Sequence, residues 1–465
     1  MKPDPNEPVN LVGGGLAGAL LAVLLAKRGF AVRLFERRPD PRRSAAERGR
    51  SINLALAARG IRALERAGVM DQVRPLLIPM RGRMIHDGSG QTTLQPYGQR
   101  EDEVIYSVGR AALNRLLIEQ AARHPAVTVR FDQTCLGANP ARDVLRLRDE
   151  LAASEYEVKL SPTIAADGAG SAVRVSLASA AYLAVREEFL DHDYKELTIP
   201  ASAPASAVPR TPTPPTAPAL APHALHIWPR GGFMLIALPN TDGSFTATAF
   251  LARHGENSFA SLHSDAAAFE FFHREFPDAL PLMPQFLEEF RAHPQGQLGT
   301  VHTSPFHVGG RVLLIGDAAH AIVPFHGQGM NAAFEDCLAL DTSLDAHTRW
   351  DSLFAEFSQE RRPNAASIAQ MALENYTEMR HTVLDAKFVR QKELALELER
   401  RYPDRFIPRY AMVMFHPEIP YAEALRRGAV QTEILDVLDQ ERQRTGGLDL
   451  AAADSLIRAR LPALA

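Results

Sequence analysis

Short apolar runs of strand length recur along the chain and alternate with longer helical patterns. A run that is followed by a helix and then by another run is typical of a βαβ unit. The strands predicted on this basis are residues 9–12, 31–35, 105–108, 127–131 and 312–315. The helices predicted beside them are residues 48 to about 67, 110–122 and 330–340.

A second set of apolar segments predicts strands of another, antiparallel sheet. These segments are residues 78–86, 93–97, 225–229, 233–238 and 244–250. Two-residue alternation would put Arg81 and Arg83 on one face of this sheet. If that face is internal, each guanidinium needs an anion, because an unpaired buried charge is costly. If it is external, both are solvated, and the alternation leaves both readings open.

The remainder of the chain is predicted to be mostly helical. Residues 265–290 form one helical region, and helices at 351–361 and 363–380 lead into a C-terminal helical region. Residues 201–222 are rich in proline, alanine, serine and threonine, which predicts an extended surface loop or partial disorder.

A glycine motif lies between the first strand and the first helix. Residues 13–18 read GGGLAG, so Gly13, Gly15 and Gly18 form G-x-G-x-x-G around Leu16 and Ala17. The first two glycines permit a tight turn and a close approach to a pyrophosphate, and Gly18 lets helix and strand pack closely. Glu36, at the end of the second strand, is placed for a ribose hydroxyl. A motif in this context predicts dinucleotide binding.

Residues 312–331, VLLIGDAAHAIVPFHGQGMN, form a second strand-turn-helix segment. A glycine-lined helix start presents backbone N–H groups and a positive dipole end, so an anion is expected there. Asp317 can accept hydrogen bonds from sugar-like hydroxyls. Taken alone, the segment is equally consistent with an ordinary loop. Asp167-Gly168, in residues 161–174, is a second acidic turn of the same kind.

Composition restricts the remaining possibilities. The chain has 465 residues, 46% of them hydrophobic, and a net charge of −4, which indicates two or three domains and no nucleic-acid partner. Its two cysteines, Cys135 and Cys337, exclude a disulfide framework or a zinc site, and we expect no metal. The longest apolar run, residues 19–26, is far short of the ~20 residues of a spanning helix. We therefore predict a cytoplasmic protein with no membrane partner.

The glycine motif and the two acidic turns together resemble a known family. Separate domains for a flavin and a nicotinamide dinucleotide would carry two glycine motifs, and this chain has one. The combination resembles the single-component FAD aromatic hydroxylases of the para-hydroxybenzoate hydroxylase type. Within them it is similar to the kynurenine 3-monooxygenases, from about residue 9 to beyond residue 410. The segments that carry this similarity are RGRSINLAL at 48–56, MRGRM at 80–84, LHIWP at 225–229, residues 316–331, ENY at 374–376 and FIPRY at 406–410.

The resemblance implies an α/β fold. It consists of a Rossmann-like FAD-binding domain, an inserted antiparallel β-sheet substrate domain and a C-terminal helical region. The implied FAD-binding parts are residues 1–75, 101–185 and 296–372. The implied substrate-domain parts are residues 76–100 and 186–295, and the helical region is 373–465.

The resemblance also implies roles for individual residues. Arg83 and Tyr410 would bind the substrate carboxylate, and Tyr97 and Asn375 would position the substrate. The pocket beside the flavin would be lined by Pro324, Phe325 and His326. The implied FAD-binding residues are Gly13, Gly15, Leu16, Ala17, Gly18, Glu36, Arg37, Arg110, Asp167, Gly316, Asp317, Gly329, Met330 and Asn331. We expect structural or pocket-lining roles, not acid–base catalysis, for His320 and His326.

The implied activity is hydroxylation of L-kynurenine to 3-hydroxy-L-kynurenine with NADPH and O2, a step of tryptophan degradation. It would proceed through a flavin C4a-hydroperoxide, so no side chain is assigned as a certain catalytic group. Eukaryotic members of this family end in a membrane anchor, and we expect the soluble bacterial type here. A monomer and a homodimer both stay open. Two alternatives also stay open: a hydroxylase of another aromatic acid, and a flavin-binding module that oxidises or senses a protein partner.

Overall fold

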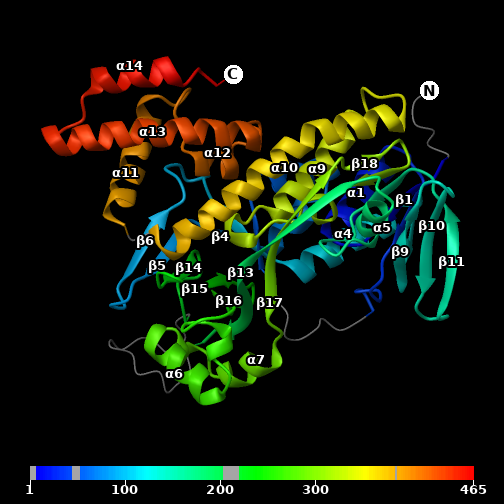
Figure 1. Ribbon diagram of the computed structural model, residues 1–465, viewed down its shortest axis with the longest axis horizontal. Helices are drawn as coiled ribbons and strands as arrows, with labels where there is room; N and C mark the ends of the chain where they lie inside the picture. Colours follow the sequence, from blue (N-terminus) through cyan, green and yellow to red (C-terminus); the bar gives the residue numbers. More distant parts are fainter. Residues whose placement is uncertain (1–6, 44–52, 203–218, 383–384, 465) are drawn as a thin grey trace. The chain divides into compact units, whose positions relative to one another are not determined.

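The computed structural model describes residues 7–43, 53–202, 219–382 and 385–464 (Figure 1). The chain divides into two compact units. Unit 1 comprises Met1–Ile78, Tyr106–Leu190 and Gln297–Ala372, and unit 2 comprises Pro79–Ile105, Asp191–Gly296 and Leu373–Ala465. The predictions for residues 48–52, and for residues 203–218 of the proline-rich segment 201–222, lie outside the described residues.

Unit 1 is built on a six-stranded sheet with the order β18-β19-β12-β1-β2-β8. Its strands are β1 (Val9–Val12), β2 (Val32–Phe35), β8 (Val127–Arg130), β12 (Thr163–Ala165), β18 (His307–Val308) and β19 (Val312–Leu314). All neighbouring pairs are parallel except β18 and β19. The parallel order confirms the predicted βαβ arrangement.

Helices cover this sheet. Helix α1 (Leu16–Lys27) is buried from Gly18 to Ala26, which explains its uninterrupted apolar sequence. It packs against α4 (Arg110–Arg123) and α9 (Gly329–Ser343). The other short helices of unit 1 are α2 (Ala58–Ala67), α3 (Met70–Val73), α5 (Ala172–Ser179) and α8 (Asp317–His320), with 3-10 turns η1 (Arg74–Leu76) and η4 (Pro324–His326).

The helix predicted from residue 48 is wrong in its first part. Residues Asn53–Leu56 form strand β3, which pairs antiparallel with β7 (Ile105–Gly109) in a small sheet that also contains β4 (Leu77–Met80). Helix α2 begins only at Ala58. The side chain of Asn331 fixes this change of direction, because it binds the carbonyl of Ala55 and the N–H of Ala57. That long-range contact is not visible in local sequence.

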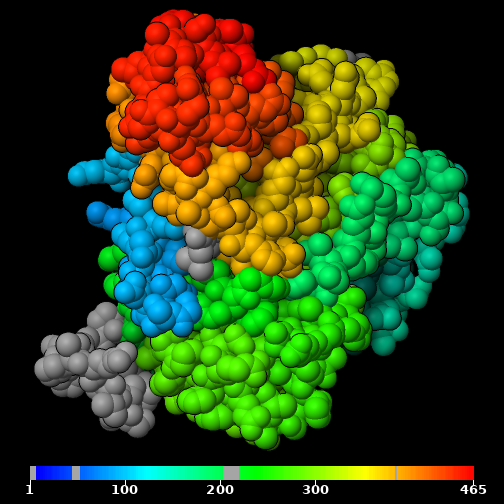
Figure 2. All heavy atoms as spheres, turned by 60° about the vertical axis from the view of Figure 1, so that its left-hand side comes forward, coloured from blue at the N-terminus to red at the C-terminus, as the bar shows by residue number. Residues whose placement is uncertain are grey.

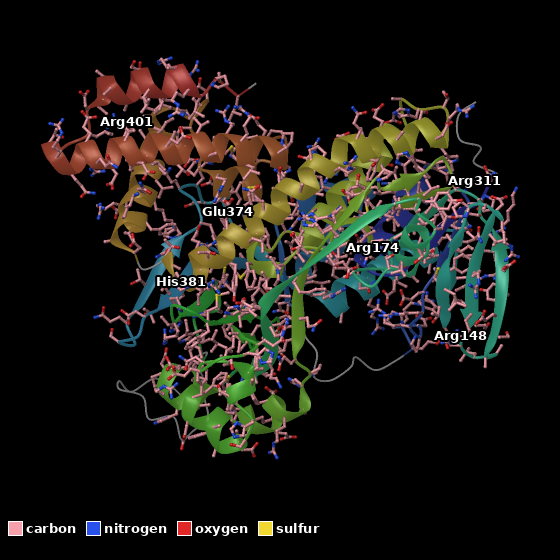
Figure 3. The ribbon with its side chains drawn as sticks, viewed as in Figure 1. Arg148, Arg174, Arg311, Glu374, His381 and Arg401 are labelled. Atoms are coloured by element: carbon pink, nitrogen blue, oxygen red, sulfur yellow. The ribbon has the colours of Figure 1, made fainter. Side chains whose placement is uncertain are left out.

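A three-stranded antiparallel sheet in unit 1 was not predicted. It consists of β9 (Gln133–Asn139), β10 (Val144–Asp149) and β11 (Ser154–Lys159). Strand β10 does show the alternation of a half-buried strand: Leu145 and Leu147 are buried, whereas Arg146 and Arg148 are exposed. Figure 3 labels Arg148 on this strand. The signal was present but short.

A seven-stranded sheet has the order β17-β13-β16-β15-β14-β5-β6, and its strands from β16 to β6 lie in unit 2. The strands are β5 (Gly82–His86), β6 (Thr92–Pro96), β13 (Ala184–Ile199), β14 (Leu225–Pro229), β15 (Met234–Pro239), β16 (Phe245–Ala252) and β17 (Gly296–Ser304). The antiparallel pairing predicted for β14, β15 and β16 is confirmed, whereas β5 pairs parallel with β14. Beside this sheet, α6 (Asp265–Glu275) and α7 (Phe286–Ala292) contribute a cluster of phenylalanines to the core.

Arg81 and Arg83 do not share an environment, contrary to the predicted alternation. The strand is interrupted at Arg81, whose N–H donates to the carbonyl of His223 and whose side chain is exposed. Arg83 lies inside β5 and is buried. Of the two open readings for this pair, the buried one therefore holds for Arg83 and the solvated one for Arg81.

A buried histidine pair connects β5, β14 and the segment after α6. His86 Nε2 lies 2.8 Å from His226 Nδ1, and His86 Nδ1 lies 3.1 Å from Asp278 Oδ2. His226 Nε2 lies 2.9 Å from the carbonyl oxygen of Ala221, which can only accept. His226 therefore donates from Nε2 and accepts at Nδ1, and the Nε2–H of His86 donates to it. His86 Nδ1 faces the carboxylate of Asp278, so the two histidines tie β5 and β14 to that residue.

This cluster predicts a loss of stability in acid. Burial lowers the pKa of His226 to about 4, below the unfolded value near 6.5. The contribution of neutral His226 to the free energy of unfolding is therefore complete above about pH 6.5 and is lost as the pH falls toward 4. The loss has an upper bound of about 3 kcal/mol. Urea unfolding should give a smaller unfolding free energy near pH 4.5 than near pH 7.

The fluorescence of Trp228, which stacks on His86 at 4.0 Å, can follow this unfolding in a Trp350→Phe background, because the chain has two tryptophans. The glutamine side chain in His226→Gln does not titrate in this range. The unfolding free energies of this variant near pH 4.5 and near pH 7 should therefore differ less than those of the wild type. An equal pH dependence in both proteins would remove His226 as its source.

The two helices predicted on either side of Pro363 are one. Helix α10 runs from Trp350 to Arg380 with Pro363 inside it. Pro363 cannot donate a hydrogen bond, but buried residues on both sides, including Phe354, Phe357 and Ile368, hold the two halves in place. Tertiary packing thus outweighs the local preference for a break.

The C-terminal helices of unit 2 form a core of their own. They are α11 (Ala386–Arg401), α12 (Arg409–Phe415), α13 (Tyr421–Thr445) and α14 (Leu450–Arg460). Leu394, Leu398, Ile434, Leu438 and Ile457 pack together in it. Figure 2 shows the red C-terminal segment as one continuous mass of atoms. Among the described residues, no helix combines the length and the apolar character that crossing a membrane requires.

Candidate active site

The glycine motif forms a tight turn between β1 and α1 in unit 1. Gly13 has a φ of +98°, which favours glycine. A Cβ on Gly18 would lie 1.9 Å from the carbonyl oxygen of Gly13, so α1 can approach the turn this closely only with glycine there. A Cβ on Gly15 would meet no protein atom within 4 Å. The turn is thus closed on the side of the sheet and open at Gly15.

Glu36, at the end of β2, is buried and faces this turn. Its Oε2 accepts the N–H of Gly14 at 2.6 Å, and its Oε1 accepts the N–H and Nε–H of Arg38 at 2.9 and 2.8 Å. The neighbouring Arg37 is exposed. The structure therefore brings Glu36 to the glycine turn, as the spacing predicts, and leaves Arg37 at the surface.

Two helices of unit 1 begin without a side-chain cap. Helix α1 starts after Gly15 with Leu16 and Ala17, and α9 starts with Gly329, Met330 and Asn331. Neither helix has an acidic residue in its first turn, so the positive ends of both dipoles are uncompensated by their own side chains. Helix starts of this kind bind phosphates and other anions.

Asn331 reaches the start of α9 but its side chain is fully engaged. Its Nδ2 donates to the carbonyls of Ala55 and Gly327 at 2.8 and 2.9 Å, and its Oδ1 accepts the N–H of Ala57 at 2.9 Å. Any contact with a cofactor is therefore left to the backbone of Asn331.

The two acidic turns lie at the ends of adjacent strands, β12 and β19. Asp317 is exposed and follows Gly316, whose positive φ of +54° favours glycine. Asp167 is mostly buried, and its Oδ1 has no hydrogen-bond partner among the described residues. Burial raises the pKa of Asp167. The buried, orphaned oxygen and the exposed Asp317 are both available to a ligand with hydroxyl donors.

Arg174, labelled in Figure 3, ties these two turns together through its hydrogen bonds. Its guanidinium is 2% exposed and donates to the carbonyls of Ala169 and Ala318 at 2.5 and 3.0 Å. Ala169 follows the first acidic turn and Ala318 follows the second, so one buried side chain fixes their spacing. The sequence placed Arg174 at a helix start but gave no sign of this role.

The remaining residues predicted in unit 1 differ in exposure. Arg110, the first residue of α4, is exposed, and so is Pro324. Phe325 and His326, in the turn η4, are buried. Taken together, the open glycine turn, two uncapped helix starts and the orphaned Asp167 oxygen fit a dinucleotide such as FAD.

A second constellation lies in unit 2 around Arg83. Arg83 Nη1 lies 2.7 Å from Glu378 Oε1, and Nη2 lies 3.3 Å from Asn375 Oδ1. The guanidinium also lies over the ring of Tyr410, 4.9 Å from its centroid. A buried, forked cation of this kind is suited to a carboxylate.

Tyr97 and Tyr410 form one wall of this constellation. Their rings stack with centroids 5.6 Å apart and planes 13° apart. Burial and the neighbouring Tyr410 raise the pKa of Tyr97, so its hydroxyl stays neutral and can donate to an anion. The four residues predicted to bind substrate, Arg83, Tyr97, Asn375 and Tyr410, are therefore brought together.

Sequence reasoning missed two charged residues beside Arg83. Glu378 lies one turn after Asn375 on α10, so the helical spacing was an available signal. Lys392 is on α11, where burial and the charge of Arg83 lower its pKa to about 8. No local pattern points to Lys392. The constellation thus contains two cations and one anion.

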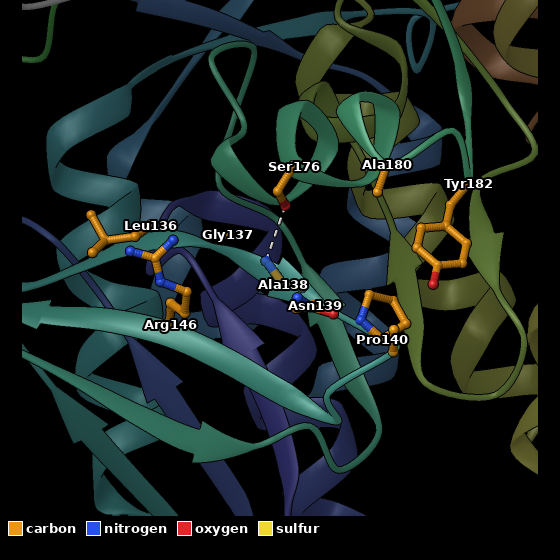
Figure 4. A pocket seen from close by; sticks show the side chains of 10 residues that line it. Leu136, Gly137, Ala138, Asn139, Pro140, Arg146, Ser176, Ala180 and Tyr182 are labelled. Carbon is orange, nitrogen blue, oxygen red and sulfur yellow. Dashed lines mark hydrogen bonds between the residues drawn. The ribbon is translucent and has the colours of Figure 1, made fainter.

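A cavity of about 370 Å³ lies elsewhere in unit 1, between β9 and α5 (Figure 4). Ser176 and Tyr182 are among the residues that line this cavity. The hydroxyl of Ser176 accepts the N–H of Ala138 at 3.0 Å. None of the residues predicted to bind FAD or substrate lines this cavity. Within the described part of the chain, no group of three or more histidines, cysteines or acidic residues is placed to hold a metal.

Comparison with known proteins gives consistent relatives. Residues 6–372 match the family model of an FAD binding domain. The kynurenine 3-monooxygenase of Xanthomonas axonopodis pv. citri is 47% identical over 464 residues, covering 100% of this chain and 99% of the relative. That of Stenotrophomonas maltophilia is 46% identical over 459 residues, covering 99% and 98%.

Solved structures share the fold at low identity. The tetrameric form of 2-methyl-3-hydroxypyridine-5-carboxylic acid oxygenase is 18% identical, with a TM-score of 0.63 over 80% of this chain and 92% of that one. The p-nitrophenol 4-monooxygenase of Pseudomonas putida is also 18% identical, with a TM-score of 0.62 over 94% and 98%. At this identity the likeness concerns the fold alone.

Proposed function

The chain belongs to the kynurenine 3-monooxygenase family and contains its FAD binding domain, and we propose from this that it hydroxylates L-kynurenine to 3-hydroxy-L-kynurenine. Neither alternative from the sequence, another aromatic acid or a protein partner, receives support from the relatives matched over full length. NADPH as reductant, O2 as second substrate and a cytoplasmic location belong to the proposal.

One observation carries the substrate assignment. Arg83 is 6% exposed, with Asn375 and Glu378 on its guanidinium and Tyr97 and Tyr410 beside it. Arg83 offers a cation to a substrate carboxylate, and the hydroxyls of Tyr97 and Tyr410 offer it two neutral donors. Glu378 offers a carboxylate acceptor to a substrate ammonium group. The amino-acid end of L-kynurenine carries both charges. We propose that Arg83 binds the carboxylate and Glu378 the ammonium group.

FAD supplies the redox chemistry when bound, and the chain's own residues bind and orient FAD and the substrate. In the proposal, the glycine turn and the start of α1 hold the pyrophosphate, Glu36 holds a ribose, and Asp317 and the start of α9 hold the flavin end. The amino group of kynurenine donates electron density to the ring carbon beside it, so the proposal assigns no protein base. The protein's work is to fix the ring and exclude water.

Tyr410→Phe is expected to weaken L-kynurenine binding modestly. The variant loses one hydroxyl but keeps the ring that stacks on Tyr97 and lies under Arg83. One neutral hydrogen bond corresponds to about 1 kcal/mol, or roughly a fivefold rise in KM. Steady-state kinetics at saturating FAD measures it. No change in KM would place the Tyr410 hydroxyl away from the carboxylate.

The experiment that tests the proposal is NADPH oxidation by the purified holoenzyme with and without L-kynurenine. We expect strong stimulation by L-kynurenine and little by benzoate-type acids that lack the amino-acid end. Equal stimulation by such acids would contradict the assigned substrate.

A further inference from the structure

Five buried or half-buried charged side chains of unit 1 form a continuous chain beside the turn of Gly316 and Asp317. Arg59 comes from α2, His320 from α8, Glu335 and Asp336 from α9, and Arg361 from α10. Positive and negative groups alternate along it. Its contacts are Arg59–Glu335 at 2.6 Å, Glu335–Arg361 at 2.7 Å, Arg361–Asp336 at 2.7 Å and Asp336–His320 at 2.6 Å.

Asp336 connects this chain to the turn. Its Oδ2 accepts the backbone N–H of Gly316 at 2.9 Å as well as the Nε2–H of His320. A Cβ on Gly316 would lie 2.9 Å from the Cβ of Ala333, which precedes Asp336 by one turn of α9. Helix α9 therefore packs against the Gly316–Asp317 turn at this second position as well. The position of α9 and the charge of Asp336 therefore set the backbone of Gly316.

The electrostatics keep Asp336 ionised. Burial alone would raise its pKa, but His320 and Arg361 bring the pKa of Asp336 down to about 2. Burial would likewise lower the pKa of His320, but the charge and hydrogen bond of Asp336, with a smaller contribution from Asp317, raise it. All three groups bonded to Asp336 are donors, and only a carboxylate accepts from all of them.

We propose that Asp336, held by His320 and Arg361, is a positioning residue for FAD that fixes the Gly316–Asp317 turn through the amide of Gly316. The role requires FAD binding only and is independent of the identity of the aromatic substrate. A purely structural ion network would contribute to the free energy of unfolding without affecting the affinity for FAD. A second buried aspartate on α9 serves as the control for that case.

Asp341 is the matched control. It also lies on α9, is also buried, and also joins two arginines, with Arg28 Nε at 2.5 Å and Arg66 Nε at 2.7 Å. It lies five positions after Asp336, and its carboxylate accepts from those two arginine side chains instead of from the turn. Asp341→Asn therefore removes the same kind of interaction from the same helix.

The test compares Asp336→Asn with Asp341→Asn. The dissociation constant of FAD from the apoprotein is measured by flavin fluorescence, and the apoprotein's melting temperature is measured separately. We expect both variants to melt earlier and only Asp336→Asn to bind FAD at least tenfold more weakly. At saturating FAD its KM for L-kynurenine should be unchanged. Wild-type FAD affinity in Asp336→Asn, or equal weakening in Asp341→Asn, would overturn the proposal.

A second variant keeps the proposal testable if Asp336→Asn does not fold. His320→Gln retains a donor toward Asp336 but removes the charge. We expect a smaller rise in the FAD dissociation constant, about threefold, with no change in the KM for L-kynurenine at saturating FAD. An unchanged FAD dissociation constant in His320→Gln would also overturn the proposal. Failure of either FAD test leaves the kynurenine assignment intact, because that assignment rests on Arg83 in unit 2.

Discussion

Arg83→Ala is expected to raise the KM for L-kynurenine about 30- to 1,000-fold while the protein keeps its FAD. Removing one member of a buried charge pair costs about 2–4 kcal/mol, and each 1.4 kcal/mol is tenfold in affinity. Arg83 lies in unit 2 and the proposed FAD-binding residues lie in unit 1, so flavin content should not change. Steady-state kinetics and the flavin absorbance of the purified variant measure the two quantities.

A substrate analogue separates the carboxylate contact from a general disturbance. The methyl ester of L-kynurenine lacks the negative charge that Arg83 is proposed to bind. Wild-type protein should bind the ester far more weakly than L-kynurenine, and Arg83→Ala should treat the two compounds alike. A variant that still preferred L-kynurenine to its ester by the wild-type ratio would remove Arg83 from the carboxylate site.

Gly15→Ala is expected to weaken FAD binding about 10- to 100-fold without unfolding the apoprotein. The added Cβ would meet no protein atom within 4 Å, and Gly15 has a φ of −69° that alanine also adopts. Because Gly15 is the residue before the first turn of α1, the substitution should lower the free energy of unfolding by no more than about 1 kcal/mol. If the pyrophosphate occupies this open space, the Cβ displaces it from one or more charge-assisted hydrogen bonds, each about 1.5–3 kcal/mol.

Gly18→Ala is the contrasting variant in the same motif. Its Cβ would lie 1.9 Å from the carbonyl oxygen of Gly13, so the protein itself must shift. We expect it to lower both the apoprotein's melting temperature and the FAD affinity. Titration of apoprotein with FAD, together with thermal unfolding, distinguishes the two glycines. Wild-type FAD affinity in Gly15→Ala would place the pyrophosphate elsewhere.

The sequence was most informative where the chemistry is local. Gly15 and Glu36 lie within one βαβ unit, so their spacing predicted a turn that the structure contains. Strand β3 was missed because the bend after it is held by Asn331, which lies 274 positions from Ala57 and 276 from Ala55. The break predicted at Pro363 failed for a related reason, since packing along both halves of α10 is tertiary.

The constellation in unit 2 was only partly predictable from residues alone. Alternation could not decide whether Arg83 is buried, and it wrongly paired Arg83 with Arg81. The resemblance to a family selected Arg83, Tyr97, Asn375 and Tyr410, and the structure brings these four together. The helical spacing after Asn375 was an available signal for Glu378, which binds Arg83. No local pattern points to Lys392, whose pKa the charge of Arg83 lowers from a different part of the chain.

The most direct test of the central claim is the fate of isotopically labelled O2 in a reaction with NADPH and L-kynurenine. We expect L-kynurenine to be converted to a product that carries one labelled oxygen on its ring, with one NADPH consumed for each product formed. Mass spectrometry of the product measures this. Consumption of NADPH with labelled peroxide as the only oxygen product, and L-kynurenine recovered unchanged, would contradict the account.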